Sequence, residues 1–149
     1  MRHILLIDDD KDCLTALGDR LRFVFRGQNV EVDVADSAIT GLMLCHASYY
    51  DVLIVDLLMP GTTGLKFVEQ LRRTKPNVAV TMISGGDVKS CEEQAAVLGV
   101  IARFFLNHWT SPSCYGLSMK CWKAISLVLR FVAIGHSWSR LLQVNLVKF

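Results

Sequence analysis

The first part of the chain alternates between two hydrophobic patterns. Short runs of β-branched and aromatic residues, bounded by turn residues, predict buried strands. Between these runs, apolar residues recur every three or four positions, which is the spacing of one face of a helix. The strand-like runs cover residues 3–7, 30–34, 52–56, 78–84 and 102–106. The helical periods comprise Leu14, Leu17, Leu21 and Val24; Ile39, Leu42, Met43, Cys45 and Ala47; Leu65, Phe67, Val68 and Leu71; and Cys91, Ala95 and Leu98.

Residues at the ends of the predicted helices support these boundaries. Ser37 can cap the second helix, Gly64 precedes the third, and Lys-Pro-Asn at 75–77 stops it. Five successive strand and helix units predict a doubly wound α/β fold with right-handed crossovers and helices on both faces of a five-stranded parallel sheet. The expected strand order is 2-1-3-4-5.

Composition favours a single folded domain. A chain of 149 residues has the length of one domain, and a hydrophobic fraction of 52% argues against disorder. No stretch reaches the roughly 18 apolar residues that a membrane span requires. The opening residues, MRHILLIDDD, reach acids after too short an apolar run for a signal peptide. Five cysteines at irregular spacing indicate reduced thiols, and the expected location is the cytoplasm.

Acidic residues follow two of the predicted strands. The first strand ends in three aspartates at 8–10, the third ends in Asp56, and the fourth ends in Ser84. In the expected strand order the first and third strands are neighbours, so Asp8, Asp9 and Asp56 should meet at one edge of the sheet. Carboxylates so close repel one another unless a cation intervenes. Mg²⁺ fits such oxygen ligands, and a carboxylate beside it can act as the nucleophile that forms an acyl phosphate.

These motifs resemble a known family. Residues 1 to about 106 resemble the receiver domain of two-component response regulators, through LLIDDD at the first strand and VLIVDLLMPGTTGL at the third. The resemblance implies a flavodoxin-like (βα)₅ fold in which Asp56 is the phosphorylated residue. It further implies that Mg²⁺ is held by Asp8, Asp9, Asp56 and the backbone carbonyl of Leu58.

The resemblance extends to the residues that respond to phosphorylation, with one departure. TMISGG looks like the switch segment, which implies that Ser84 is the switch hydroxyl and Phe104 the switch aromatic. The family carries Lys-Pro after the fifth strand, whereas this chain has Asn107 and His108. An amide brings no positive charge, so we expect a loss of interaction with the phosphoryl group of about 1.5 to 3 kcal/mol. His108 or Lys89 could substitute for the missing ammonium group.

The resemblance implies a single-domain response regulator that receives a phosphoryl group from a histidine kinase or phosphotransfer protein and passes the signal to a downstream protein. Such a chain is a phosphoacceptor rather than an enzyme. One alternative is a receiver fold that binds partners independently of phosphorylation because its switch has decayed at Asn107. An outside alternative is a phosphatase of the haloacid dehalogenase type, because Asp8 and Asp10 after a strand also match that nucleophile motif.

The chain changes character after the fifth predicted strand. Residues 1–110 hold 11 basic and 14 acidic residues, a charge of −3, whereas residues 111–149 hold five basic and no acidic residues, a charge of +5. We therefore divide the chain into a receiver domain at 1–125 and an atypical, basic and apolar extension at 126–149.

Three explanations of this C-terminal part stay open. The fifth helix is expected within residues 119–134, and this part of the chain could pair with a second copy through the face formed by the fourth helix, fifth strand and fifth helix. It could lie on an acidic membrane, although a membrane partner is not the expectation. An altered or out-of-frame end would explain the joint loss of Lys-Pro, acids and helix pattern. The part beyond the receiver is too short for a helix-turn-helix domain, so direct binding to nucleic acid is not expected.

Overall fold

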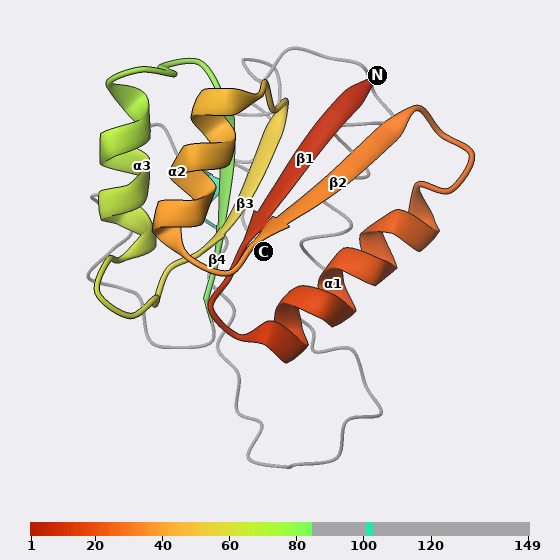
Figure 1. Ribbon diagram of the computed structural model, residues 1–149, viewed down its shortest axis with the longest axis horizontal. Coiled ribbons are helices and arrows are strands. Elements are labelled where there is room, and N and C mark those ends of the chain that lie inside the picture. The colour runs from red at the N-terminus through yellow and green to blue at the C-terminus, as the bar shows by residue number, and fades with distance from the viewer. Residues whose placement is uncertain (85–100, 103–149) are drawn as a thin grey trace, which may run out of the picture.

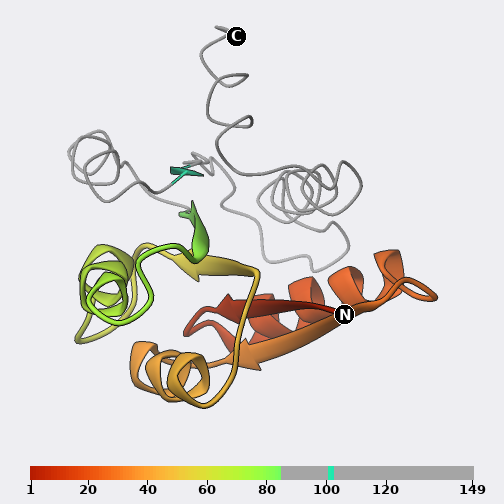
Figure 2. The same cartoon turned by 90° about the horizontal axis from the view of Figure 1, so that it is seen from above.

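A computed structural model describes residues 1–84 and 101–102 and shows a parallel sheet with helices on both faces (Figures 1 and 2). The strands are β1 (Arg2–Ile7), β2 (Val30–Ala35), β3 (Val52–Asp56), β4 (Ala79–Ile83) and β5 (Ile101–Ala102). They lie in the order β2-β1-β3-β4, with the two described residues of β5 beside β4. The predicted order is therefore confirmed for the first four strands, and all described pairings are parallel.

Helix α1 (Lys11–Val24) covers one face of the sheet. Asp10 is its N-cap, and the Asp10 carboxylate accepts hydrogen bonds from the backbone N–H groups of Asp12 and Cys13 at 3.0 and 3.2 Å. Leu14, Leu17 and Leu21 are buried, as their helical spacing predicts. The helix therefore begins directly beneath the acidic end of β1.

Helices α2 (Ala38–Ala47) and α3 (Gly64–Arg72) cover the opposite face (Figure 2). The Ser37 hydroxyl caps α2 by accepting a hydrogen bond from the Thr40 N–H at 3.1 Å, which confirms the predicted cap. Thr63 caps α3, and its side chain accepts a hydrogen bond from the Lys66 N–H at 3.3 Å. Gly64, expected just before this helix, is its first residue.

The apolar residues that predict α2 do not all face the sheet. Ile39 and Met43 are 72% and 67% exposed. The close packing of this helix explains the difference, because a Cβ at Gly41 would lie 2.7 Å from the Cδ1 atom of Ile7 and 3.2 Å from Phe67. Small residues therefore occupy the side of α2 that faces the sheet, and the larger ones remain in contact with water.

The core lies in two layers, one on each face of the sheet. Alternate residues of the central strands point to opposite faces, as strand geometry requires. Leu5 and Leu53 belong to the layer under α2 and α3, while Leu6 and Ile54 belong to the layer under α1. Every residue of β3 is buried, which confirms the prediction of a strand covered on both faces.

Several predicted features lie outside the described residues. They are the fourth helix over Cys91 to Leu98, most of the fifth strand over 102–106, Lys89, Phe104, Asn107, His108 and the extension at 126–149. Within the residues that are described, no helix has the length and apolar character needed to cross a membrane.

Candidate functional site

Three carboxylates meet where two neighbouring strands end. Ile7 of β1 is in register with Val55 of β3, so the residues that follow each strand emerge side by side. Asp8, Asp9 and Asp56 each place a carboxylate oxygen within 4.8 Å of the others. The convergence expected from the sequence is therefore present. Asp8 and Asp56 are only 4% and 6% exposed, whereas Asp9 is exposed to solvent.

Backbone hydrogen bonds orient the two buried carboxylates. Asp8 Oδ1 accepts a hydrogen bond from the Asp10 N–H at 2.9 Å, and Asp56 Oδ2 accepts one from the Leu58 N–H at 2.9 Å. Each bond spans two residues, a turn that aspartate side chains form readily. The third consecutive acid, Asp10, directs its side chain to the backbone of α1 instead. Thus only two of the three adjacent aspartates belong to the cluster.

The loop after β3 packs tightly beneath the cluster. The Gly64 N–H donates a hydrogen bond to the Leu57 carbonyl at 2.9 Å. A Cβ at Gly64 would collide with the backbone oxygen of Asp56 and would lie 2.7 Å from the Met82 Cε atom. Gly64 therefore allows α3 to begin directly against the strand end that carries Asp56. The sequence predicts Gly64 only as a residue at a helix boundary. Its contact with the backbone of Asp56 could not be predicted, because such a contact does not affect the spacing of apolar residues.

Other parts of the predicted site lie at the same edge of the sheet. Leu58, whose carbonyl is a predicted metal ligand, has an exposed side chain. Ser84 is fully buried and follows Ile83, which pairs with Asp56 across the β3–β4 ladder. The Leu57 N–H also donates a hydrogen bond to the Ile83 carbonyl at 2.8 Å. Ser84 thus extends from a strand directly beside that of Asp56, while Phe104 and Asn107 lie outside the described residues.

The chemistry of the cluster suits a hard divalent cation. Carboxylates this close raise one another's electrostatic energy, and a bound cation relieves the repulsion. Mg²⁺ binds oxygen ligands at about 2.0–2.1 Å, usually through one or two carboxylates with the rest of the shell from water or phosphate. Two buried acids and one exposed acid within 4.8 Å supply such ligands and leave access from solvent. The residues therefore fit Mg²⁺.

Comparison with known proteins agrees with this geometry. Residues 4–105 match the family model for the response regulator receiver domain. A curated relative, the response regulator receiver protein Anae109_2439 of Anaeromyxobacter sp. strain Fw109-5, is 29% identical over 102 residues. That match covers 68% of this chain and 41% of the relative. Sensory transduction protein RegX3 of Mycolicibacterium smegmatis is 29% identical over 87 residues, which cover 58% of this chain and 36% of RegX3.

Solved structures share the fold. The signal receiver domain of a DNA-binding response regulator from Colwellia psychrerythraea has a TM-score of 0.69 at 20% identity, and the match covers 89% of this chain and 99% of that one. A structure described as adenylate cyclase from Rhodopirellula baltica has a TM-score of 0.68 at 25% identity, with 95% and 97% of the two chains covered. Because the family model covers more than half of the chain and the acidic cluster lies where its motifs predict, this chain belongs to the response regulator receiver domain family of two-component signalling.

Proposed function

We propose that the chain receives a phosphoryl group on Asp56 from a histidine kinase or phosphotransfer protein in a reaction that depends on Mg²⁺. The observation that carries this proposal is the meeting of Asp8, Asp9 and Asp56 within 4.8 Å at the end of the central strands. Bound there, Mg²⁺ would offset the negative charge of the incoming phosphoryl group.

Each acid has a distinct role in this proposal. Asp8, Asp9, Asp56 and the Leu58 carbonyl would hold the ion. The Leu58 N–H fixes the orientation of the Asp56 carboxylate through Oδ2. An Asp56 oxygen then forms a bond to phosphorus as the bond from phosphorus to the donor's histidine nitrogen breaks, and the imidazole keeps the electron pair. The protein contributes chiefly by positioning and by its electrostatic environment.

The proposed output depends on residues at the same edge of the sheet. The Ser84 hydroxyl binds the phosphoryl oxygen, and Phe104 changes position in response. The face formed by the fourth helix, fifth strand and fifth helix of the complete (βα)₅ fold then changes its affinity for a downstream protein or a second copy. In this proposal the chain acts in the cytoplasm as a phosphoacceptor, and residues 126–149 form an extension to the receiver.

A second function follows from the departure at Asn107. Without a lysine ammonium group at that position, phosphorylation of Asp56 would be poorly coupled to the output face, and the chain would act as a constitutive binding module. The partner affinity of the wild type with and without phosphorylation separates the two functions. A switching receiver changes its partner affinity on phosphorylation, whereas a binding module does not, and coupling that appears only in N107K would assign the loss to Asn107.

The hydrolase alternative requires a different nucleophile and a different reaction. A phosphatase of the haloacid dehalogenase type would turn over a phosphate ester with Asp8 as its nucleophile. Membership in the receiver family favours Asp56 instead. Turnover of para-nitrophenyl phosphate that disappears in Asp8→Asn but persists in Asp56→Asn would favour the hydrolase.

The test of the main proposal uses the full chain and acetyl phosphate. With Mg²⁺ present, intact-mass spectrometry should show the addition of one phosphoryl group, and removal of Mg²⁺ by a chelator should prevent it. Asp56→Asn should gain no mass. Asp12→Asn is the matched control, because Asp12 is an exposed acid of the first turn of α1 outside the cluster. No mass gain on the wild type, or an equal gain on Asp56→Asn, would contradict the proposal.

A further inference from the structure

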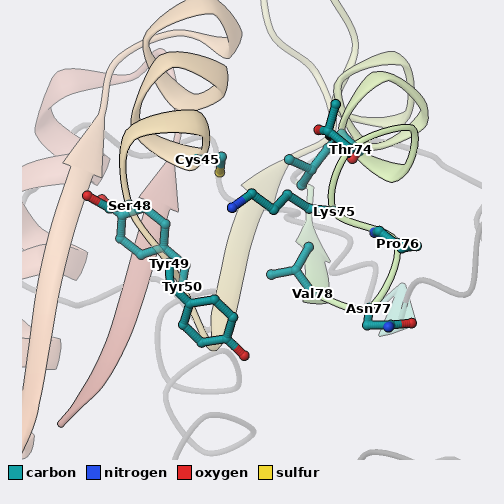
Figure 3. A pocket seen from close by; sticks show the side chains of 10 residues that line it. Cys45, Ser48, Tyr49, Tyr50, Thr74, Lys75, Pro76, Asn77 and Val78 are labelled. Atoms are coloured by element: carbon teal, nitrogen blue, oxygen red, sulfur yellow. Dashed lines mark hydrogen bonds between the residues drawn. The ribbon is translucent and has the colours of Figure 1, made fainter.

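A cavity lies at the end of the sheet where β3 and β4 begin, and Figure 3 shows the residues that line it. It has a volume of about 200 Å³ and opens between the C-terminal ends of α2 and α3. Residues 48–50 form one wall, residues 74–78 form the other, and Cys45 and Leu71 lie at its base. These segments precede β3 and β4, whereas Asp56 ends β3. The cavity is therefore separate from the proposed site of phosphorylation.

Hydrogen bonds hold both walls in place. Arg72 donates from its guanidinium group to the carbonyls of Lys75, Pro76 and Val78, and so fixes the loop that follows α3. On the other wall, the Tyr50 hydroxyl donates a hydrogen bond to Asp33 Oδ2 at 2.8 Å. Because these bonds already order the loops, a ligand would lose little affinity to their ordering.

The cavity combines apolar walls with one cation. Leu71, Pro76 and Val78 supply apolar surface, and Figure 3 shows the ammonium group of Lys75 directed across the opening toward Cys45. Among the residues that the structure describes, no aspartate or glutamate lines the cavity and no carboxylate forms an ion pair with Lys75. Lys75 is also half-buried, whereas Lys11 and Lys66, the other lysines that the structure describes, are exposed.

The pKa of the Cys45 thiol depends on the electrostatic environment of this cavity. Burial raises its pKa to about 11, and the nearby charge of Lys75 acts in the opposite direction. The Lys75 ammonium group therefore favours negative charge inside the cavity. A partly desolvated cation beside apolar walls is the arrangement that recognises an organic anion, because the walls bind the body of the ligand and the cation binds its charged group.

We propose that this cavity binds a small aromatic monocarboxylate, with its ring between the apolar walls and its carboxylate paired with Lys75. The size of the cavity suits a ligand of this class. An apolar cavity of about 150 Å³ accepts benzene, so about 200 Å³ holds one ring with a carboxylate. Ligands of drug size occupy pockets of roughly 300–1,000 Å³. The carboxylate supplies one negative charge for an ammonium group that has no acidic partner among the described residues.

The test is a titration of the full chain with benzoate at constant ionic strength, followed by ¹H–¹⁵N correlation spectra. Saturable shifts should appear at Ser48, Tyr49, Lys75 and Asn77. Lys75→Met keeps an apolar stem and removes the charge, so it should weaken benzoate binding by about tenfold. Lys66→Met, the matched exposed lysine of α3, should bind benzoate as the wild type does. Benzamide, which keeps the ring without the charge, should bind the wild type more weakly than benzoate.

Two further results would overturn the proposal. One is the absence of saturable shifts at these residues up to the solubility limit of benzoate. The other is equal benzoate affinity in the wild type and Lys75→Met, provided that both give the same dispersed spectrum. Asp56→Asn should bind benzoate normally, so the outcome is independent of whether Asp56 accepts a phosphoryl group. Benzoate should also slow alkylation of Cys45, measured by peptide mass spectrometry.

Discussion

The backbone oxygen of Asp56 lies so close to Gly64 that no side chain fits between them. The first residue of α3 is thereby held against the end of β3, and the Gly64 N–H bonds to the Leu57 carbonyl at the same place. The helix and the strand that carries the central acid of the site thus form one rigid corner. Any residue with a Cβ at position 64 must push these two backbones apart.

Gly64→Ala should therefore destabilise the protein by about 3 kcal/mol, because the neighbouring atoms include backbone that cannot rotate away. Gly27→Ala is the control. Gly27 has a φ of +77°, and a Cβ added there would meet no atom within 4 Å, so only backbone strain of about 1 kcal/mol is expected. Urea denaturation compares the two free energies of unfolding. Equal losses of unfolding free energy in Gly64→Ala and Gly27→Ala would show that the close contact with Asp56 does not contribute to stability.

Mg²⁺ binding should distinguish two adjacent aspartates. Asp9→Asn removes a charge from the cluster and should weaken Mg²⁺ binding by about tenfold. Asp10→Asn should leave the affinity near that of the wild type, because Asp10 caps α1 and asparagine is an equally good cap. Isothermal titration calorimetry measures both. Equal weakening in the two variants would argue for a diffuse acidic surface instead of a defined site.

Two adjacent arginines should differ in their contribution to stability. Arg72→Met removes the donor that binds three carbonyls of the following loop and should cost about 2 kcal/mol. Arg73→Met should change the free energy of unfolding by less than about 0.5 kcal/mol, because its ion pair with Glu69 is exposed and 3.7 Å long. Urea denaturation at one pH compares them, and a cost at Arg73 as large as that at Arg72 would contradict this assignment.

Alkaline pH should destabilise the protein through Cys45. Burial raises the pKa of this thiol from 9.0 to about 11, so between these values the unfolded chain loses the proton before the folded one does. Stability then falls as pH rises, with a slope approaching about 1.4 kcal/mol per unit from this group. Below about pH 8 both states keep the thiol proton and the contribution is constant.

The measurement compares the unfolding free energies of the wild type and Cys45→Ala from pH 7 to 11. The wild type should lose more stability than Cys45→Ala above pH 9, while the difference between them stays constant below pH 8. Burial also raises the pKa of Tyr50, as does its hydrogen bond to Asp33, so Tyr50→Phe should remove a further part of the alkaline loss. Parallel pH profiles for the wild type and Cys45→Ala would contradict the burial of this thiol.

The sequence predicts the sheet and the acidic cluster for clear physical reasons. A strand buried on both faces must be almost entirely apolar, and the run that ends in Asp56 has this composition. Parallel topology places the carboxyl ends of the strands at one edge, and the order 2-1-3-4-5, one of the common doubly wound orders, brings Asp56 to Asp8 and Asp9. The prediction of the strand depends on the residue pattern within one segment. The prediction of the cluster depends in addition on the general rule for the order of strands in doubly wound sheets.

Other features depend on contacts between segments and leave no such pattern. Gly64 meets the backbone of Asp56 across a loop, and Arg72 binds carbonyls that follow its own helix. The exposure of Ile39 and Met43 depends on how closely Gly41 packs against the sheet. The cavity beside Lys75 exists only because two loops meet. None of these relationships changes the periodicity of the sequence.

The position of β1 between β2 and β3 has a consequence for synthesis of the protein. The strand made first has one ladder neighbour at residues 30–35 and another at residues 52–56. On the ribosome, the second edge of β1 stays unpaired until β3 has emerged, and an unpaired apolar edge invites association with other nascent chains. When β3 pairs with β1, the hydrogen-bonding groups on that edge of β1 are satisfied, and Asp56 comes close to Asp8. The same pairing step therefore removes the exposed edge and assembles the acidic cluster.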